Sequence, residues 1–430
     1  MKDWKLKVEH YFLRYENLLK IFSANFLMRG SVVAINLGTG ILMRRELGEA
    51  NSGLFGLFIG SLVLFATMLN FGFNGSAIYY AGKKPDKLQL YLTTNFIVTA
   101  VSIFVIAFSL FVFSFFFQFQ SNWLRIIFII CYAIYSFSLV YRSFLLGMGE
   151  NLYMQKIDLL SRIAYAFFMV FSYYFHCLSV LNIAIFMTLE YLVFTYLAHG
   201  KTELKIWPLS WDKTFFKENI LFNSKAYIAG ILYILLLKAD QFIIKIFFNN
   251  HQVGVYGIGG TIVENLFMIS HIICVMYLPK LLETDDFKII INKSKKILGL
   301  IFISSLAMAF VLYFLSPWLY LWYYKKPSIE GVSCLRVLLI GFVTFSLFLL
   351  NYLIYFSVRL KKSLLIILGF GVGLNLILNF MYLPKYGIIA SAWASSICYT
   401  LVALLSIFDL YYLKKRNYIK KTLVLDEERQ

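Results

Sequence analysis

The chain has 430 residues, of which 60% are hydrophobic and 14% are charged, and its mean hydropathy is +0.75. Soluble domains are about 45–50% apolar and roughly a quarter charged, so this composition predicts a polytopic membrane protein and excludes a large soluble enzyme domain. The net charge of +18 needs no nucleic-acid partner to explain it, because basic residues also mark the cytoplasmic loops of membrane proteins.

Twelve apolar stretches follow one another along the chain, each long enough for the ~20-residue helix that crosses a bilayer. They lie at 21–43, 54–80, 91–117, 123–147, 157–177, 181–199, 220–246, 253–279, 297–316, 332–357, 364–383 and 387–413. The expected fold is therefore an all-α polytopic membrane protein with about 12 transmembrane helices. Most of the 40 basic residues fall on the two ends of the chain and on the even-numbered loops, which predicts that both termini are cytoplasmic.

The segments outside the apolar stretches divide the chain. Residues 1–20 predict a cytoplasmic interfacial amphipathic helix with a basic face, and a disordered basic tail is the alternative. A cytoplasmic amphipathic linker is expected at 200–219 and a cytoplasmic tail at 414–430. The rest of the chain is expected to form an N-terminal six-helix lobe at 21–199 and a C-terminal six-helix lobe at 220–413.

Two pentapeptides point to an internal repeat. Gly-Leu-Phe-Gly-Leu at 53–57 and Gly-Val-Tyr-Gly-Ile at 254–258 match in residue type, and each opens a span after a short external loop. Six spans per copy keep the copies parallel, so we expect two parallel six-helix bundles around a central cavity, a plan in which transporters bind substrate between the repeats. Helix-packing glycines without any repeat are the alternative.

A polar stripe surrounds a cation in the first span. Arg29 lies near the middle of that span, and at about 100° per residue Asn25 and Asn36 fall on the same face. A charge at mid-bilayer costs on the order of 3 kcal/mol and usually faces a wet cavity, so these three residues are predicted to line a substrate cavity. Arg142, in the fourth span, is a further candidate, with snorkelling to the cytoplasmic end as the alternative.

The seventh and eighth spans carry charges of both signs. Lys225 and Lys238 are further candidates for binding the substrate, whereas Asp240 and Glu264 are predicted to bind a coupling ion, Na⁺ or H⁺. Glu264 is the acid that we most readily expect to pair with the seventh span. A plain ion pair with Lys238 or Lys245 is the alternative for both acids.

The fifth and sixth spans contain three more charges. Asp158 and Arg162 are expected to pair at i, i+4, and Glu190 has no predicted partner. Basic groups available to the cavity then outnumber acidic ones, which favours a substrate that carries phosphate or another anionic group.

Catalytic and cofactor signatures do not appear in the sequence. The five cysteines and five histidines lack disulfide or metal-ligand spacing, and no phosphate-binding loop, hydrolase elbow or zinc-protease motif is present. We therefore expect a transporter that is not an enzyme and that has no cofactor beyond the coupling ion.

Three stretches resemble a known family. They are Leu-Gly-Glu-Ala-Asn-Ser-Gly-Leu-Phe-Gly-Leu at 47–57, Lys-Ala-Asp-Gln-Phe-Ile-Ile at 238–244 followed by Val-Gly-Val-Tyr at 253–256, and Leu-Pro-Lys-Tyr-Gly-Ile-Ile-Ala-Ser-Ala at 383–392. Their order and spacing are similar to those of the polysaccharide exporters of the multidrug/oligosaccharidyl-lipid/polysaccharide (MOP) flippase superfamily, with O-antigen flippases of the Wzx type the nearest members. In that family a cavity arginine and a seventh-helix aspartate stand where this chain has Arg29 and Asp240.

The resemblance implies a flippase of the bacterial cytoplasmic (inner) membrane. Such a protein moves an undecaprenyl-diphosphate-linked oligosaccharide, destined for O-antigen of lipopolysaccharide, capsule or a similar polymer, from the cytoplasmic to the outer leaflet by ion-coupled alternating access. Its partners would be this lipid-linked glycan, membrane lipids and, in the same pathway, a polysaccharide polymerase and glycosyltransferases.

Three rival functions make different predictions. A multidrug/cation antiporter of the same superfamily would have an acidic cavity. A membrane-embedded polysaccharide polymerase would carry catalytic residues on a long external loop, whereas the longest expected here is short, at 316–331. A lipid scramblase or structural membrane protein would not need the stripe around Arg29.

Overall fold

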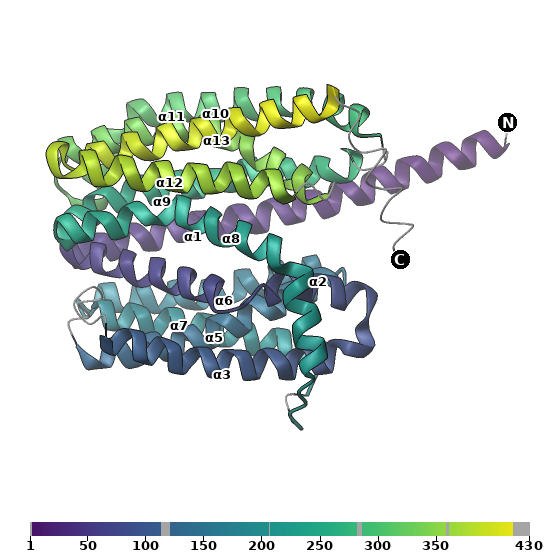
Figure 1. Cartoon of the computed structure of the whole chain (residues 1–430), viewed down its shortest axis with the longest axis horizontal. Coiled ribbons are helices and arrows are strands. Elements are labelled where there is room, and N and C mark those ends of the chain that lie inside the picture. The colour runs from purple at the N-terminus through teal and green to yellow at the C-terminus, as the bar shows by residue number, and fades with distance from the viewer. Residues whose placement is uncertain (1, 113–120, 206, 282–285, 358–360, 416–430) are drawn as a thin grey trace. The chain divides into compact units, whose positions relative to one another are not determined.

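The structure is a computed structural model that describes residues 2–112, 121–205, 207–281, 286–357 and 361–415, with the backbone alone at 2–26, 111–112, 272, 275–276, 278–281, 357 and 361. Within these ranges the chain forms twelve α-helices and one short 3₁₀-helix (Figure 1). The all-α fold class is thus confirmed.

The helices have the following bounds in chain order: α1 (Lys2–Met68), α2 (Phe73–Lys83), η1 (Pro85–Lys87), α3 (Leu88–Val112), α5 (Asn122–Gly147), α6 (Asn151–Tyr174), α7 (Val180–Thr202), α8 (Lys213–Phe247), α9 (Asn250–Leu281), α10 (Phe287–Tyr324), α11 (Ile329–Ser357), α12 (Lys361–Tyr386) and α13 (Ile388–Lys415).

Ten of the described helices are long and apolar enough to cross a membrane. The apolar part of α1, Leu27–Met68, has 42 residues, about twice the ~20 that one crossing needs, and it is kinked inside. α6 has 24 residues but carries several charges, so its hydropathy is lower. With α1 counted as two crossings and α6 included, the described helices accommodate the twelve expected spans.

Two backbone breaks interrupt the first two expected spans. Gly48, at φ 68° and ψ −175°, adopts a conformation that is essentially restricted to glycine, and it kinks α1 where an external loop was expected. Phe71 and Gly72, at φ 51° and 82°, separate α1 from α2. The second span, expected as one helix over 54–80, is therefore a broken helix, and the expectation of a continuous one is wrong.

The described chain divides into two compact units. Unit 1 comprises Met1–Leu47 and Leu69–Asn223, and unit 2 comprises Gly48–Met68 and Ser224–Gln430. Helices α1 and α8 each contribute to both units. The division after Asn223 lies close to the expected start of the C-terminal lobe, whereas Gly48–Met68, expected in the N-terminal lobe, groups with unit 2.

Backbone contact between two glycines explains this grouping. A Cβ atom on Gly53 would lie 1.9 Å from the carbonyl oxygen of Asn250, and one on Gly254 would lie 1.9 Å from that of Glu49. The second half of α1 and the start of α9 therefore approach at a distance that only glycine permits, as in small-residue crossings of membrane helices. These glycines open the pentapeptides at 53–57 and 254–258, and their close contact is what the alternative of helix-packing glycines predicts.

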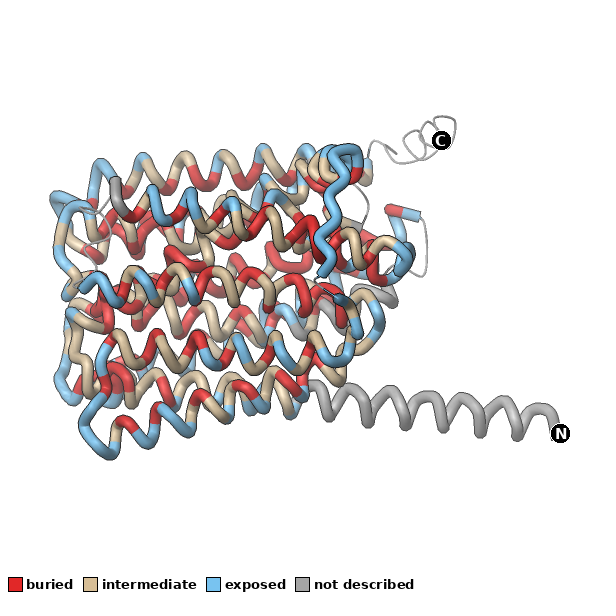
Figure 2. Tube along the Cα trace, turned by 90° about the horizontal axis from the view of Figure 1, so that it is seen from below, coloured by how far each residue is buried: buried red, intermediate tan, exposed pale blue. Residues whose placement is uncertain are grey.

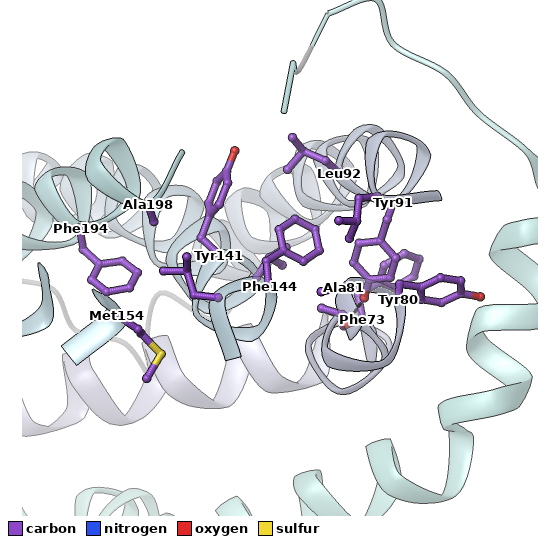
Figure 3. Close-up of a cluster of buried hydrophobic side chains, with 14 of the residues drawn as sticks. Phe73, Tyr80, Ala81, Tyr91, Leu92, Tyr141, Phe144, Met154, Phe194 and Ala198 are labelled. Carbon is purple, nitrogen blue, oxygen red and sulfur yellow. Dashed lines mark hydrogen bonds between the residues drawn. The ribbon is translucent and has the colours of Figure 1, made fainter. Parts of the chain in front are cut away.

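Each unit has its own core. In unit 1, α5 packs against α2, α3 and α7, and an aromatic cluster joins them (Figure 3). In unit 2, α11 packs against α9, α10 and α13. The described helices carry both buried and exposed positions (Figure 2), and the exposed positions include large apolar side chains such as Phe108 and Phe310, as expected for helices that face lipid.

Candidate functional site

The cation of the first span is available for binding. Arg29 is half-buried on α1 and makes no hydrogen bond or ion pair with any residue that the structure describes. Asn36, seven residues on, lies on the same helix face, and its Oδ1 atom is buried without a hydrogen-bond partner. The side chain of Asn25 lies outside the described residues. Two members of the predicted stripe therefore have unused hydrogen-bonding capacity.

The second arginine candidate is compensated. Nη2 of Arg142 lies 2.6 Å from Oδ1 of Asp158, and its guanidinium stacks over the ring of Phe194 at 4.0 Å. The expected pairing of Asp158 with Arg162 within one helix is wrong, because α5 places Arg142 closer. Arg142 meets a carboxylate inside unit 1 and is a weaker candidate for an anionic substrate than Arg29.

Arg162 instead reaches the next helix. Its Nη2 lies 3.0 Å from Oε1 of Glu190 on α7, and the side chain of Glu190 is only 1% exposed. Sequence reasoning left Glu190 without a partner, because the contact depends on how α6 packs against α7. The two pairs Arg142–Asp158 and Arg162–Glu190 in unit 1 are thus each electrically neutral.

In unit 2, Asp240 is buried among neutral donors. One carboxylate oxygen accepts hydrogen bonds from the Tyr256 hydroxyl on α9 and, at 3.2 Å, from the Ser395 hydroxyl on α13, and the other accepts from the backbone N–H of Gln241 at 2.8 Å. Only 3% of Asp240 is exposed. A buried carboxylate ringed by neutral oxygen and nitrogen groups is chemically able to take up a proton or a small hard cation.

Two polar residues that sequence reasoning missed extend the hydrogen-bond network of Ser395. Asn375 on α12 donates to Ser395 at 3.3 Å, and Asn379 donates to the backbone of Asn375 at 2.9 Å. Both are buried. Their i, i+4 spacing within an apolar span was a signal that could have placed them on one polar face of that span.

Two of the other charges of the seventh and eighth spans pair with each other. Nζ of Lys238 lies 2.6 Å from Oε1 and 2.8 Å from Oε2 of Glu264, so the expectation that Glu264 pairs with the seventh span is confirmed. Lys238 and Glu264 therefore neutralise each other, whereas Asp240 keeps its separate set of donors. Lys225 is exposed on α8, and no contact of its side chain is described. Among the described residues, no group of three or more His, Cys, Asp or Glu could hold a metal ion.

The fold of this chain is similar to that of solved membrane transporters, among them members of the MOP superfamily. The lipid II flippase MurJ, in an inward closed conformation, superposes with a TM-score of 0.70 at 14% identity over 91% of this chain and 87% of its own. An inward-facing multidrug resistance MATE family transporter gives 0.66 at 13% identity over 92% and 99%. A Pyrococcus furiosus MOP superfamily transporter, described by the reverse polarity of its binding pocket, gives 0.66 at 14% identity over 93% and 97%.

Sequence comparison is less informative. No protein-family model matches the chain. The uncharacterized membrane protein MJ1375 of Methanocaldococcus jannaschii is 29% identical over 181 residues, which is 41% of this chain and 41% of that protein. The match thus spans less than half of the relative's length.

Proposed function

We propose that this protein is a flippase that moves an undecaprenyl-diphosphate-linked oligosaccharide from the cytoplasmic to the outer leaflet of the bacterial cytoplasmic membrane. A diphosphate with several sugars does not cross ~30 Å of hydrocarbon unaided, whereas the apolar polyprenyl tail dissolves in the lipid. The MOP fold supplies a scaffold on which solved structures show inward-facing and outward-facing conformations, as alternating access requires.

The observation that carries the proposal is the polarity of the unpaired charge. Within the described spans, Asp158, Glu190 and Glu264 each meet a cation, whereas Asp240 is buried and accepts hydrogen bonds from neutral donors. Arg29 meets no described partner. A free guanidinium attracts phosphate oxygens, to which it can donate two parallel hydrogen bonds, and it repels the cationic drugs that an antiporter would export.

Asp240 is the proposed coupling site. Because its carboxylate joins α8, α9 and α13, binding H⁺ or Na⁺ there would change the contacts of three helices at once. Ion binding would then favour one conformation over another by its differential affinity.

Under this proposal both termini are cytoplasmic, as the basic even-numbered loops predict. The lipid-linked glycan then enters from the side where glycosyltransferases assemble it, and a polymerase on the outer face consumes the product. Labelling of single cysteines introduced near each terminus, with a membrane-impermeant thiol reagent on intact cells, checks the orientation. Reaction from outside would refute it.

Export of the glycan by Arg29 variants tests the function. We expect deletion of the protein to accumulate lipid-linked oligosaccharide in the cytoplasmic leaflet, and Arg29→Ala at equal protein level to reproduce that accumulation. Arg29→Lys keeps the charge but loses the bidentate geometry and should restore export in part. Arg125→Ala removes another half-buried arginine, close to a helix end, and serves as the matched control.

Three results would contradict the proposal. Unchanged export by both Arg29 variants would remove this residue from the site. Accumulation in the outer leaflet on deletion would point to a polymerase. Loss of resistance to cationic drugs with no glycan accumulation would point to an antiporter.

A further inference from the structure

Five asparagines of unit 1 gather at the break in the second span. Asn70 lies in the break, Asn74 is in the first turn of α2, and Asn95 is on α3. Asn219 and Asn223 are one turn apart on the same face of α8. Nδ2 of Asn70 donates to Oδ1 of Asn95 at 3.4 Å, and Oδ1 of Asn70 accepts from the backbone N–H of Asn74 at 2.7 Å. Broken membrane helices occur where the backbone lines a site.

These amides have much unused hydrogen-bonding capacity. Asn95, Asn219 and Asn223 are 0%, 1% and 5% exposed. Buried amide atoms without a hydrogen-bond partner are Oδ1 of Asn74, Nδ2 of Asn95, both Nδ2 and Oδ1 of Asn219, and Nδ2 of Asn223. Donors and acceptors are both represented, so a ligand group has to accept as well as donate to satisfy them.

An aromatic cluster fixes the elements that carry the amides. Phe73 of α2 packs against Tyr91 of α3 (Figure 3), with ring centroids 5.3 Å apart. Phe73 also packs against Phe216 of α8, with ring centroids 5.9 Å apart. The hydroxyls of Ser76 and Tyr91 are hydrogen-bonded at 2.8 Å. The helices that carry the asparagines are therefore fixed by packing. This favours a preformed site, because the amides cannot easily move to form hydrogen bonds with one another.

One side of the cluster is open. Gly75, on the first turn of α2, is exposed, and a Cβ atom placed on it would meet only Oδ1 of Asn223, at 3.7 Å. A side chain of ordinary size would occupy the space in front of Asn223. Glycine at this position leaves that space to another group.

We propose that these asparagines bind sugar hydroxyls of the transported lipid-linked glycan, an inference that rests on the proposed function. The orphaned groups are neutral, so a phosphate or an ammonium would find no counter-charge among them. A hydrocarbon chain would leave five buried polar atoms unsatisfied, which is strongly unfavourable. A sugar hydroxyl donates one hydrogen bond and accepts others, and vicinal hydroxyls match an amide that offers both. Arg29 then holds the diphosphate, and the asparagines hold the sugars.

Binding of two matched probes tests the inference. One is the lipid-linked oligosaccharide that accumulates in a strain lacking this protein, and the other is the same lipid after enzymatic removal of its sugars, leaving polyprenyl diphosphate. We expect the purified full-length protein to bind the first at least about tenfold more tightly, since a few neutral hydrogen bonds suffice for that ratio. In Asn219→Leu/Asn223→Leu the two dissociation constants should differ by less than about twofold, with binding of polyprenyl diphosphate unchanged.

Two further variants keep the test decisive. Asn351→Leu removes a buried asparagine of unit 2 that is bonded to Ser406 at 2.9 Å, and it should keep the wild-type ratio. Gly75→Leu leaves every amide in place and fills the open side of the cluster. It should therefore bring the two dissociation constants to similar values, and it replaces the double leucine variant as the test if that variant does not fold.

The outcomes separate the two proposals. The first outcome is that the wild-type ratio of dissociation constants persists in the double leucine variant or, if that variant does not fold, in Gly75→Leu. In either case the asparagines bind no sugar, and the flippase proposal still stands. We expect Arg29→Ala to weaken the binding of both probes by the same factor. If the deletion strain accumulates no lipid-linked oligosaccharide, the flippase proposal fails and the sugar site fails with it.

Discussion

The contact of α1 with α9 allows a quantitative prediction about two single methyl groups. A Cβ on Gly53 or Gly254 would lie 1.9 Å from a carbonyl oxygen of the facing helix, whereas ordinary contacts begin at 3.4 Å. Both oxygens belong to helical backbone, which cannot turn aside as a flexible side chain can. Alanine at either position therefore forces the helices apart by about 1.5 Å, the difference between those two distances.

The energetic cost follows from that separation. Overpacking of a well-packed contact typically costs about 1–3 kcal/mol, against the roughly 0.5–1 kcal/mol that Gly→Ala gains in a helix interior. We expect Gly53→Ala to lower the free energy of unfolding by about 1 kcal/mol, the difference between the cost and the gain, and Gly254→Ala by a similar amount. Because the first methyl already separates the helices, the double variant should lose less than the sum of the single losses.

Equilibrium unfolding in detergent micelles measures these losses, and a double-mutant cycle measures their coupling. Gly230→Ala, on α8, is the matched control, because no atom lies within 4 Å of a Cβ placed there and the helix should tolerate or welcome the methyl group. Gly53→Ala and Gly254→Ala variants as stable as the wild type would refute the contact. Strictly additive losses would show that the two glycines do not share one interface.

Three further predictions follow from other described contacts. Gly48→Ala should lower the unfolding free energy by about 1–3 kcal/mol, since φ 68° with ψ −175° is a glycine conformation, and a melting curve unchanged from the wild type would argue against the kink. Glu190→Leu should destabilise by about 3 kcal/mol because Arg162 is left without its anion, and adding Arg162→Leu should restore most of that loss; a double variant no better than the single would contradict the pairing. Asp240→Asn keeps an oxygen that accepts from its donors but removes the charge, so glycan export should lose its dependence on the H⁺ or Na⁺ gradient, and persistent dependence would place the coupling site elsewhere.

Hydropathy and spacing predicted most of the fold, because span length and amphipathic periodicity are local properties. They also predicted the pairing of Glu264 with the seventh span, since α8 and α9 are neighbours in the chain. The break after Met68 was missed, because Phe71 adopts φ 51°, which its sequence context does not indicate. The grouping of Gly48–Met68 with unit 2 depends on a contact between segments about two hundred residues apart.

The candidate sites were predicted less completely than the fold. Asp158 and Arg162 lie at a spacing that favours a pair on one helix, yet each is taken by a residue on another helix. Which residue forms the ion pair depends on the distance between side chains of packed helices, and a single sequence does not specify that distance. Asn375 was overlooked beside Asp240 because single amides in apolar spans are common and become informative only when α12 and α13 meet.

The three ion pairs have a consequence for the biogenesis of the protein. Each joins helices that follow one another in the chain: α5 with α6, α6 with α7, and α8 with α9. Since a lone charge costs about 3 kcal/mol at the centre of an inserting helix, a hairpin whose two arms carry opposite charges can enter the bilayer with those charges already neutralised. Arg29 enters without such a companion in the described chain, and under the proposed function the diphosphate of the substrate would supply its counter-charge.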